Sequence, residues 1–255
     1  MTTAPVLVDA CGPAWRVTLN RPQQGNACSA DLVRGLDEAL ARAQAQGAQA
    51  FVLQGEGRHF CTGFDLSNLD SETDDTLLAR FVRIELLLQR LARAPFLTVA
   101  FAHGRTMGAG ADLFSACQLR FAHPDTSFAF PGARGFGLVL GTRRLAARVG
   151  AEAAIAWVET ARSIDCEEAR RSGLVTAIAE NPQSVTEAVA DRMHGNSALG
   201  AVVRDAVAPQ GSMEDARDLD LLVRSAAGPG LHERIGAYVQ RSAAVRRASP
   251  ASALT

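Results

Sequence analysis

The chain of 255 residues contains no lysine, so arginine supplies all 26 of its basic side chains. This absence excludes Schiff-base chemistry and lysine nucleophiles, and any phosphate group must be contacted through arginines or backbone amides. The formal net charge is only −1, because 27 acidic residues balance the arginines. Without a basic excess, we expect no nucleic-acid partner.

Long apolar runs are also absent, since no segment approaches the roughly 18 residues that a membrane-spanning helix needs. The first residues contain no basic stretch followed by an apolar core, so they do not resemble a secretory signal. We therefore expect a cytoplasmic protein with no membrane partner.

Cysteine occurs five times, without any CxxC pair. Scattered cysteines in odd number predict neither a disulfide framework nor a metal site, and reduced thiols pack as small apolar groups. We therefore expect no bound metal. The five residues are Cys11, Cys28, Cys61, Cys117 and Cys166.

Apolar periodicity alternates between the spacing of strands and that of helices along the first 180 residues. Such alternation is typical of a layered α/β domain. The expected strands are 15–20, 50–54, 96–102, 119–122 and 173–178, and the expected helices are 29–46, 77–91, 138–149, 151–161 and 167–171. Residues 128–137 read as a glycine-rich loop, and the pattern after residue 185 is helical only. We therefore expect a core at 1–195 and a helical region at 196–255.

Two glycine-rich segments, 55–66 and 103–112, each follow a predicted buried strand, and the second leads into a helix. The first amides of a helix have no internal hydrogen-bond partner and lie at the positive end of the helix dipole. Small residues let a ligand oxygen approach such amides closely. The segments therefore suit an anionic oxygen, although a tight strand-to-helix connection without any ligand has the same pattern.

Four motifs in this order resemble those of the crotonase (enoyl-CoA hydratase/isomerase) superfamily. They are residues 19–22 with 26–27, then 60–66, 104–113 and 163–175. The resemblance implies the crotonase (ClpP-like) fold, an α/β superhelix of repeated β-β-α turns, with C-terminal helices that assemble a homotrimer or a dimer of trimers. It also implies an acyl-CoA substrate, a place in fatty acid metabolism and no permanently bound cofactor.

In that superfamily the thioester oxygen lies between two backbone amides, one from each glycine loop. The resemblance assigns these amides to Phe64 and Ala109, and preorganised donors of this kind stabilise an enolate oxygen. Alanine at position 109, where glycine is frequent in the family, keeps the donor because the main-chain N–H acts. The residues that the resemblance assigns to coenzyme A are Asn26, Ala27, Phe60, Cys61, Thr62, Asp65 and Leu66.

The hydratases of the superfamily use two glutamates, and this chain departs from the pattern at both positions. Asp112 stands at the first position, and Gly132, directly after Pro131, stands at the second. Water addition needs one group to activate water and another to deliver a proton, so we expect weak hydratase activity. Asp112 is either the remaining acid–base group or a structural carboxylate paired with an arginine.

Other side chains could replace the missing glutamate. Arg134 lies in the altered loop and suits a substrate carboxylate. Tyr238, the only tyrosine, lies on the last predicted helix, where some relatives bring a residue over the acyl pocket. His59 and His103 flank the two glycine loops, but a lone histidine in such a place is more often a structural group. The sequence does not decide between them.

Two functions of different class follow from these residues. The first is an acyl-CoA-processing enzyme of the enoyl-CoA hydratase/isomerase family that stabilises a thioester enolate. For this enzyme, isomerase- or decarboxylase-like chemistry with a single base is favoured over standard hydration. The alternative is a non-catalytic CoA-binding or assembly subunit.

Overall fold

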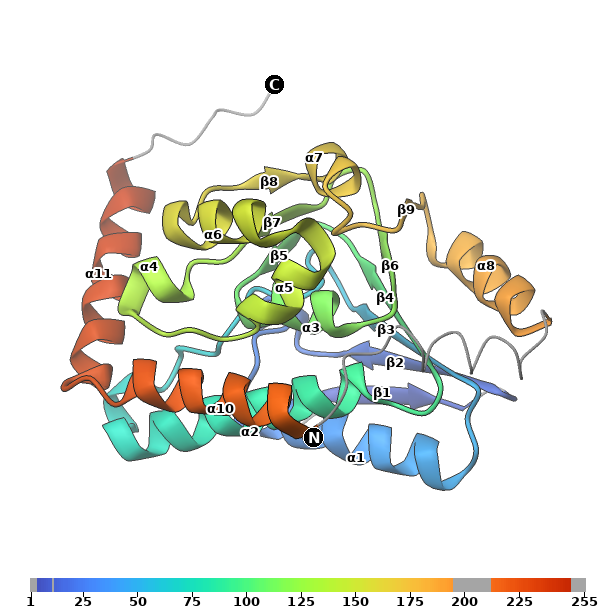
Figure 1. The fold of residues 1–255 in the computed structure, drawn as a ribbon, viewed down its shortest axis with the longest axis horizontal. Coiled ribbons are helices and arrows are strands. Elements are labelled where there is room, and N and C mark those ends of the chain that lie inside the picture. Colours follow the sequence, from blue (N-terminus) through green and yellow to red (C-terminus); the bar gives the residue numbers. More distant parts are fainter. Residues whose placement is uncertain (1–3, 11, 195–211, 249–255) are drawn as a thin grey trace.

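Six strands form the larger of two sheets in the computed structural model, which describes residues 4–10, 12–194 and 212–248 (Figure 1). Their order is β1-β2-β3-β4-β6-β9, with β1 antiparallel to β2 and the others parallel. The sequence predicts all of them except β1, whose residues stay partly or fully exposed. The bounds are β1 (Val6–Asp9), β2 (Ala14–Leu19), β3 (Ala50–Gly55), β4 (Leu97–Ala102), β6 (Leu119–Ala122) and β9 (Ala177–Ile178).

Side-chain caps fix where the long helices begin. The Ser29 hydroxyl accepts a hydrogen bond from the Leu32 N–H (3.1 Å) at the start of α1, and Thr73 forms a capping box with Thr76 at the start of α2. The helices are α1 (Ala30–Ala45), α2 (Asp74–Ala92), α3 (Ala109–Ala116), α4 (Gly132–Phe136), α5 (Thr142–Val149), α6 (Ala151–Thr160), α7 (Cys166–Arg171), α8 (Pro182–His194), α10 (Ser212–Ala226) and α11 (Leu231–Ala248).

The smaller sheet contains three short strands, β5 (Arg105–Met107), β7 (Ser127–Ala129) and β8 (Ile164–Asp165). The chain therefore repeats a unit of one strand in each sheet followed by a helix, first as β4-β5-α3 and then as β6-β7-α4. The prediction of an uninterrupted loop at 128–137 is wrong, because the end of β7 and all of α4 lie within it. Glycine at 132, 135 and 137 is typical of a loop, and a helix of five residues is too short to show a helical apolar period.

The predicted helix 138–149 also begins later than expected, at Thr142. Gly137 and Gly141 have φ values of +75° and +67°, in the left-handed region that favours glycine. They end α4 and precede α5, so residues 138–141 cross between these two helices.

The two faces of the large sheet are buried against different helices. Phe51 and Leu53 of β3 belong to the main apolar core together with side chains of α1 and α2. Ala50 and Val52 point to the opposite face and pack in a second cluster that includes Val185 of α8. The period of two along β3 thus divides the molecule into two apolar layers.

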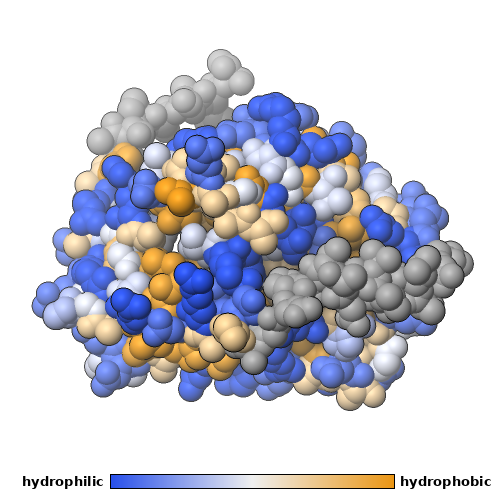
Figure 2. Space-filling view, viewed as in Figure 1, coloured by the Kyte–Doolittle hydropathy of each residue, from blue (hydrophilic) through white to orange (hydrophobic). Residues whose placement is uncertain are grey.

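The C-terminal helices pack on the core, with α10 along α2 and α11 against α4 and α2 (Figure 1). The predicted boundary between 1–195 and 196–255 falls outside the described residues, so this division stays a prediction. Within the described ranges no helix is long and apolar enough to cross a membrane. Figure 2 shows hydrophilic residues over much of one face, with apolar residues between them.

Candidate active site

Two loops meet at the C-terminal ends of the parallel strands β3 and β4. The N–H of Phe60 donates to the carbonyl oxygen of His103 at 2.9 Å, and the N–H of Met107 donates to the carbonyl oxygen of Cys61 at 2.9 Å. These backbone hydrogen bonds fix the segment after β3 against the start of α3. Ligands of α/β sheets bind at such strand ends.

Glycines allow the two loops to approach so closely. A Cβ atom on Gly110 would overlap the carbonyl oxygen of Cys61. Gly63 has a φ of +105°, and a Cβ there would lie 3.0 Å from the carbonyl oxygen of Met107 and 3.8 Å from the nitrogen of Ala109. The main chains of the two loops are therefore in direct contact.

Two backbone N–H groups are left unpaired at this junction. Phe64 directly follows Gly63, and Ala109 is the first residue of α3. Neither N–H donates a hydrogen bond to another residue in the part of the chain that the structure describes. Because the Ala109 N–H also lies at the positive end of the α3 dipole, the pair can hold an anionic oxygen.

A cavity of about 90 Å³ lies beside these two N–H groups. Its walls are mostly apolar and come from both loops, from helices α2, α3 and α4, and from α11. Among its described lining residues, the only ionisable side chains are Asp112 and Tyr238. The apolar lining residues include Phe64, Leu66, Phe81, Phe130, Phe136, Leu138, Leu140 and Val158.

Asp112 lies one turn after Ala109 on α3 and is 4% exposed. Its carboxyl group makes no hydrogen bond within the described residues, and Gly141 packs directly against its Oδ1 atom. Burial raises the pKa of Asp112 well above the ordinary aspartate value, whereas the charge of Arg144 acts in the opposite direction and that of Glu85 in the same direction. The carboxyl group therefore binds its proton unusually tightly.

A buried cluster of charges behind Asp112 explains why Arg144 does not neutralise it fully. Arg144 forms an ion pair with Glu85, and its Nη1 atom lies 3.0 Å from Asp218 of α10. Burial raises the pKa of Glu85 even beside this arginine. The Asp218 carboxylate also binds Arg143 at 2.7 Å. The positive charge near Asp112 is thus shared with two other carboxylates.

Tyr238, one of the side chains considered as a substitute for the second glutamate, lines the cavity. Gly132, at the position of that glutamate, also lines the cavity but has no side chain. Arg134 donates to the carbonyl oxygen of Glu159 at 3.2 Å and does not line the cavity. The histidines do not line it either. His59 Nδ1 accepts a hydrogen bond from the Arg105 N–H (3.1 Å), and His103 Nε2 contacts the Gly57 carbonyl oxygen (2.9 Å).

The residues predicted to line coenzyme A divide into two groups. Thr62 and Leu66 present side chains to the cavity. Phe60 and Cys61 are fully buried, Ala27 is nearly so, and none of the three lines this cavity.

Asn26 and Asp65, also predicted for coenzyme A, hold the loops together through their side chains. The Asn26 amide donates to the carbonyl oxygens of Glu56 (2.8 Å) and His59 (2.7 Å) and accepts from the Arg21 N–H (2.8 Å). Asp65 pairs with the Arg21 guanidinium at 2.6 Å. Hydrogen bonds from Ser67 and Arg21 lower the pKa of Asp65 despite its burial.

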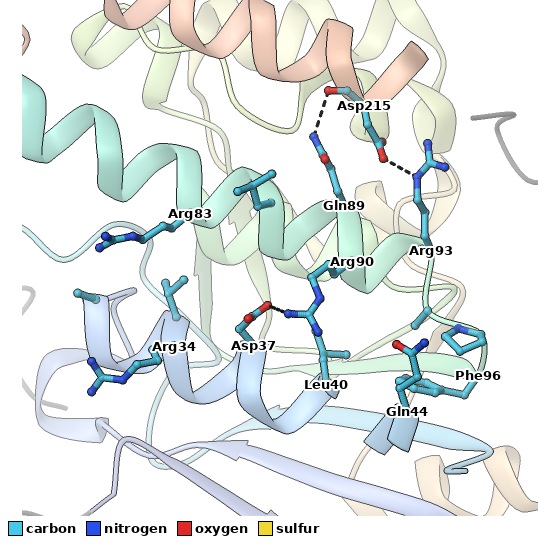
Figure 3. A pocket seen from close by; sticks show the side chains of 15 residues that line it. Arg34, Asp37, Leu40, Gln44, Arg83, Gln89, Arg90, Arg93, Phe96 and Asp215 are labelled. Carbon is cyan, nitrogen blue, oxygen red and sulfur yellow. Dashed lines mark hydrogen bonds and ion pairs between the residues drawn. The ribbon is translucent and has the colours of Figure 1, made fainter. Parts of the chain in front are cut away.

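A second hollow, a groove of about 950 Å³ between α1 and α2, lies apart from both loops (Figure 3). Both carboxylates among its described lining residues are ion-paired, Asp37 with Arg90 and Asp215 with Arg93 at 2.5 Å. Gln89 also donates to the Asp215 carbonyl oxygen at 3.1 Å. Phe64, Ala109 and Asp112 are not among the described residues that line this groove, so the smaller cavity is the candidate site.

Sequence reasoning missed the charge cluster behind Asp112. One signal existed, because Glu85 occupies a buried position of α2 between Phe81 and Leu88, where the apolar stripe predicts an apolar residue. Arg144 and Asp218, the other members of the cluster, lie 59 and 133 positions after Glu85 in the chain, and no spacing rule connects them.

The enoyl-CoA hydratase/isomerase family model matches residues 14–219. A crystal structure described as an enoyl-CoA hydratase/isomerase from Bordetella parapertussis is 40% identical, covers 93% of this chain and 99% of that chain, and superposes with a TM-score of 0.87. An enoyl-CoA hydratase structure from Thermoplasma volcanium, 19% identical with a TM-score of 0.75, shares the fold over 92% of this chain and 97% of that chain. These likenesses confirm the predicted crotonase fold.

Two relatives known by sequence carry different activities in their names. A Mycobacterium tuberculosis protein named as an enoyl-CoA hydratase is 34% identical over 166 residues, which span 64% of this chain and 65% of that protein. A peroxisomal Delta(3,5)-Delta(2,4)-dienoyl-CoA isomerase from Arabidopsis thaliana is 28% identical over 213 residues, 76% of each chain. With two loops meeting at a shared pair of N–H groups and a family model that covers most of its length, the chain belongs to the enoyl-CoA hydratase/isomerase family.

Proposed function

We propose that the chain is an acyl-CoA-processing enzyme that stabilises a thioester enolate and moves one proton through Asp112. One observation carries this proposal: two unpaired N–H groups from separate loops and one buried carboxyl group face the same small cavity. The thioester oxygen accepts hydrogen bonds from Phe64 and Ala109, so negative charge that leaves the acyl carbon is held on that oxygen.

Standard hydration fits this cavity poorly. Addition of water across a double bond requires one group to take a proton from water and another to deliver a proton to carbon. Asp112 is the only carboxyl group among the described lining residues, and Gly132 offers no side chain at the second position. Chemistry that needs one proton-transfer group is therefore favoured, as in double-bond isomerisation or decarboxylation.

Of these two reactions, the cavity favours isomerisation. Ionised Asp112 removes a proton from C2 of a 3-enoyl thioester, the charge moves to the thioester oxygen, and the same carboxyl group returns the proton to C4. The raised pKa of Asp112 makes its carboxylate a stronger base than an ordinary aspartate. Decarboxylation requires a substrate carboxylate, for which the cavity lining offers no arginine.

Coenzyme A itself must lie outside the small cavity. An open groove of about 660 Å³ borders the first of the two glycine loops and is lined by Arg21, Gln24, Arg34, Ser67 and Asn68, among others. Its two arginines and backbone amides suit phosphate oxygens in a chain that lacks lysine. The predicted cytoplasmic location and the homotrimer or dimer of trimers remain predictions, and light scattering of the purified protein measures the assembly.

Assays on a panel of thioesters test the reaction. We expect isomerisation of short 3-enoyl-CoA substrates at least about 100-fold faster than hydration of crotonyl-CoA, because one acid–base group contributes about 10²–10⁴-fold to rate. Hydration as fast as isomerisation would contradict the proposal. Binding of acyl-CoA without turnover of enoyl-, malonyl- or aryl-CoA, unchanged in Asp112→Ala, would instead support the non-catalytic CoA-binding subunit.

The pH dependence of kcat/KM tests the role of Asp112. Because isomerisation starts from the ionised carboxyl group, activity should rise with pH, with a midpoint well above 3.8, the ordinary aspartate value. Decarboxylation, which uses the protonated group to deliver a proton to carbon, would fall with pH over the same range. Stopped-assay profiles from pH 5 to pH 9 distinguish the two, and Asp112→Asn should remove the dependence along with the activity.

Replacement of Ala109 by proline tests the oxyanion donors directly. Proline is well tolerated at the first position of a helix, so Ala109→Pro removes one N–H while α3 can still form. We expect kcat to fall by about 10²–10³-fold, the usual loss for one such donor. Ala109→Gly keeps the N–H and serves as the control, with kcat within a few-fold of the original. A proline variant with normal kcat and an unchanged circular dichroism spectrum would disprove the assignment.

The same buried carboxyl group should cost stability. Since the folded state holds the Asp112 proton more tightly than the unfolded state, the free energy of unfolding falls as pH rises above 3.8, by up to about 1.4 kcal/mol per pH unit, until the group ionises in the folded state. Asp112→Asn is neutral at every pH and should unfold at a higher temperature at pH 7. Thermal melts should show this gap narrowing toward pH 4; a gap independent of pH would refute the linkage.

A further inference from the structure

The outer wall of the cavity is made by α4 and α11, which are fastened to each other. The Arg234 guanidinium of α11 donates to the carbonyl oxygen of Phe136 at 3.0 Å, and Arg241 donates to that of Gly135 at 2.9 Å. The Tyr238 ring meets the Phe136 ring edge-on, with centroids 5.4 Å apart. The short helix that replaces the catalytic segment of the hydratases is thus held closed by the last helix.

A glycine in α4 makes this closure tight. A Cβ atom on Gly135 would lie 2.8 Å from the Tyr238 ring, so the ring rests on the main chain of α4. Arg234 also donates to the carbonyl oxygens of Ala226 (3.1 Å) and Gly228 (3.0 Å), where α10 ends and the turn to α11 begins. Opening a path between α4 and α11 would break the hydrogen bonds that Arg234 and Arg241 donate to α4.

The inner wall belongs to the apolar core. Phe81, Phe130 and Leu138 line the cavity and are each at most 5% exposed. Close-packed interiors do not yield space for extra methylenes without strain. An acyl chain can therefore extend neither inward through these side chains nor outward between the two helices.

The size and polarity of the cavity limit what fits. A volume of about 90 Å³ is small and suits a thioester carbonyl with a short acyl chain. No cation is among the described residues that line the cavity. Arg144 is paired with Glu85, and Arg80, stacked on the Phe64 ring at 4.2 Å, is paired with Glu72. A charged acyl end would be buried without a partner.

We propose that the substrates are thioesters of compact, uncharged acyl groups of four to six carbons, and that the wall formed by α4 and Tyr238 of α11 excludes longer chains. This inference rests on the proposed function, since it assumes that the acyl group of a CoA thioester occupies the cavity. It adds the size and charge of that group and assigns Tyr238 as the residue that determines chain length.

Calorimetric titration with non-reacting saturated thioesters tests this inference. Butyryl- and hexanoyl-CoA should bind most tightly, whereas octanoyl- and decanoyl-CoA, and succinyl-CoA as the charged counterpart of butyryl-CoA, should bind at least tenfold more weakly than butyryl-CoA. In an open channel each buried methylene would instead tighten binding by about fourfold. Decanoyl-CoA binding as tightly as butyryl-CoA would overturn the inference and leave the proposed function standing, while failure of every thioester to bind would overturn the proposed function.

Two variants of the wall complete the test. Tyr238→Ala should restore octanoyl-CoA binding to within about threefold of butyryl-CoA, whereas Tyr238→Phe, which keeps the ring, should retain the original limit. Thermal melts establish that both variants are folded at the titration temperature. If Tyr238→Ala is folded and keeps the original limit, Tyr238 does not determine chain length and the assignment is overturned.

Discussion

The direct contact between the first turn of α3 and the loop after β3 is the constraint on which the site depends. It is made by the hydrogen bond from Met107 to the Cys61 carbonyl oxygen and by Gly110, which has no Cβ to separate the two main chains. The contact brings the N–H groups of Phe64 and Ala109, one from each loop, to one point and leaves them without a partner among the described residues. The other walls of the cavity surround these two N–H groups.

The buried Asp112 carboxyl group beside these donors is both the proposed acid–base group and a group that we expect to lower the stability of the fold. Asp112 holds its proton tightly because it is buried and because Arg144 is already engaged by Glu85 and Asp218. Full neutralisation by the arginine would make the carboxylate a weak base, and complete isolation would keep it protonated. The cluster holds the basicity of Asp112 between these two limits. Through Asp218 the cluster also connects the candidate site to α10.

The segment after Pro131 lines the cavity with a glycine and a short helix. At the position where hydratases of the superfamily carry a second glutamate, this chain has Gly132 at the start of a five-residue helix that is held closed by α11. Loss of the carboxyl group and closure of the wall occur in the same segment. The missing carboxyl group underlies the proposed reaction with one proton-transfer group, and the closed wall leaves a cavity that is small and mostly apolar.

The sequence by itself determined the layers of the fold and the loops of the site. Its apolar periods located most strands of the large sheet and the long helices, because these elements bury one face or both, and its glycines marked 55–66 and 103–112. The sequence did not predict β7 and α4, because they lie in or beside a glycine-rich segment that is typical of a loop. Tertiary structure alone decided which side chains share the cavity. Asp112 and Tyr238, 126 positions apart, face one space, while Arg134 and the histidines do not, because burial and charge pairing depend on contacts that no local spacing encodes.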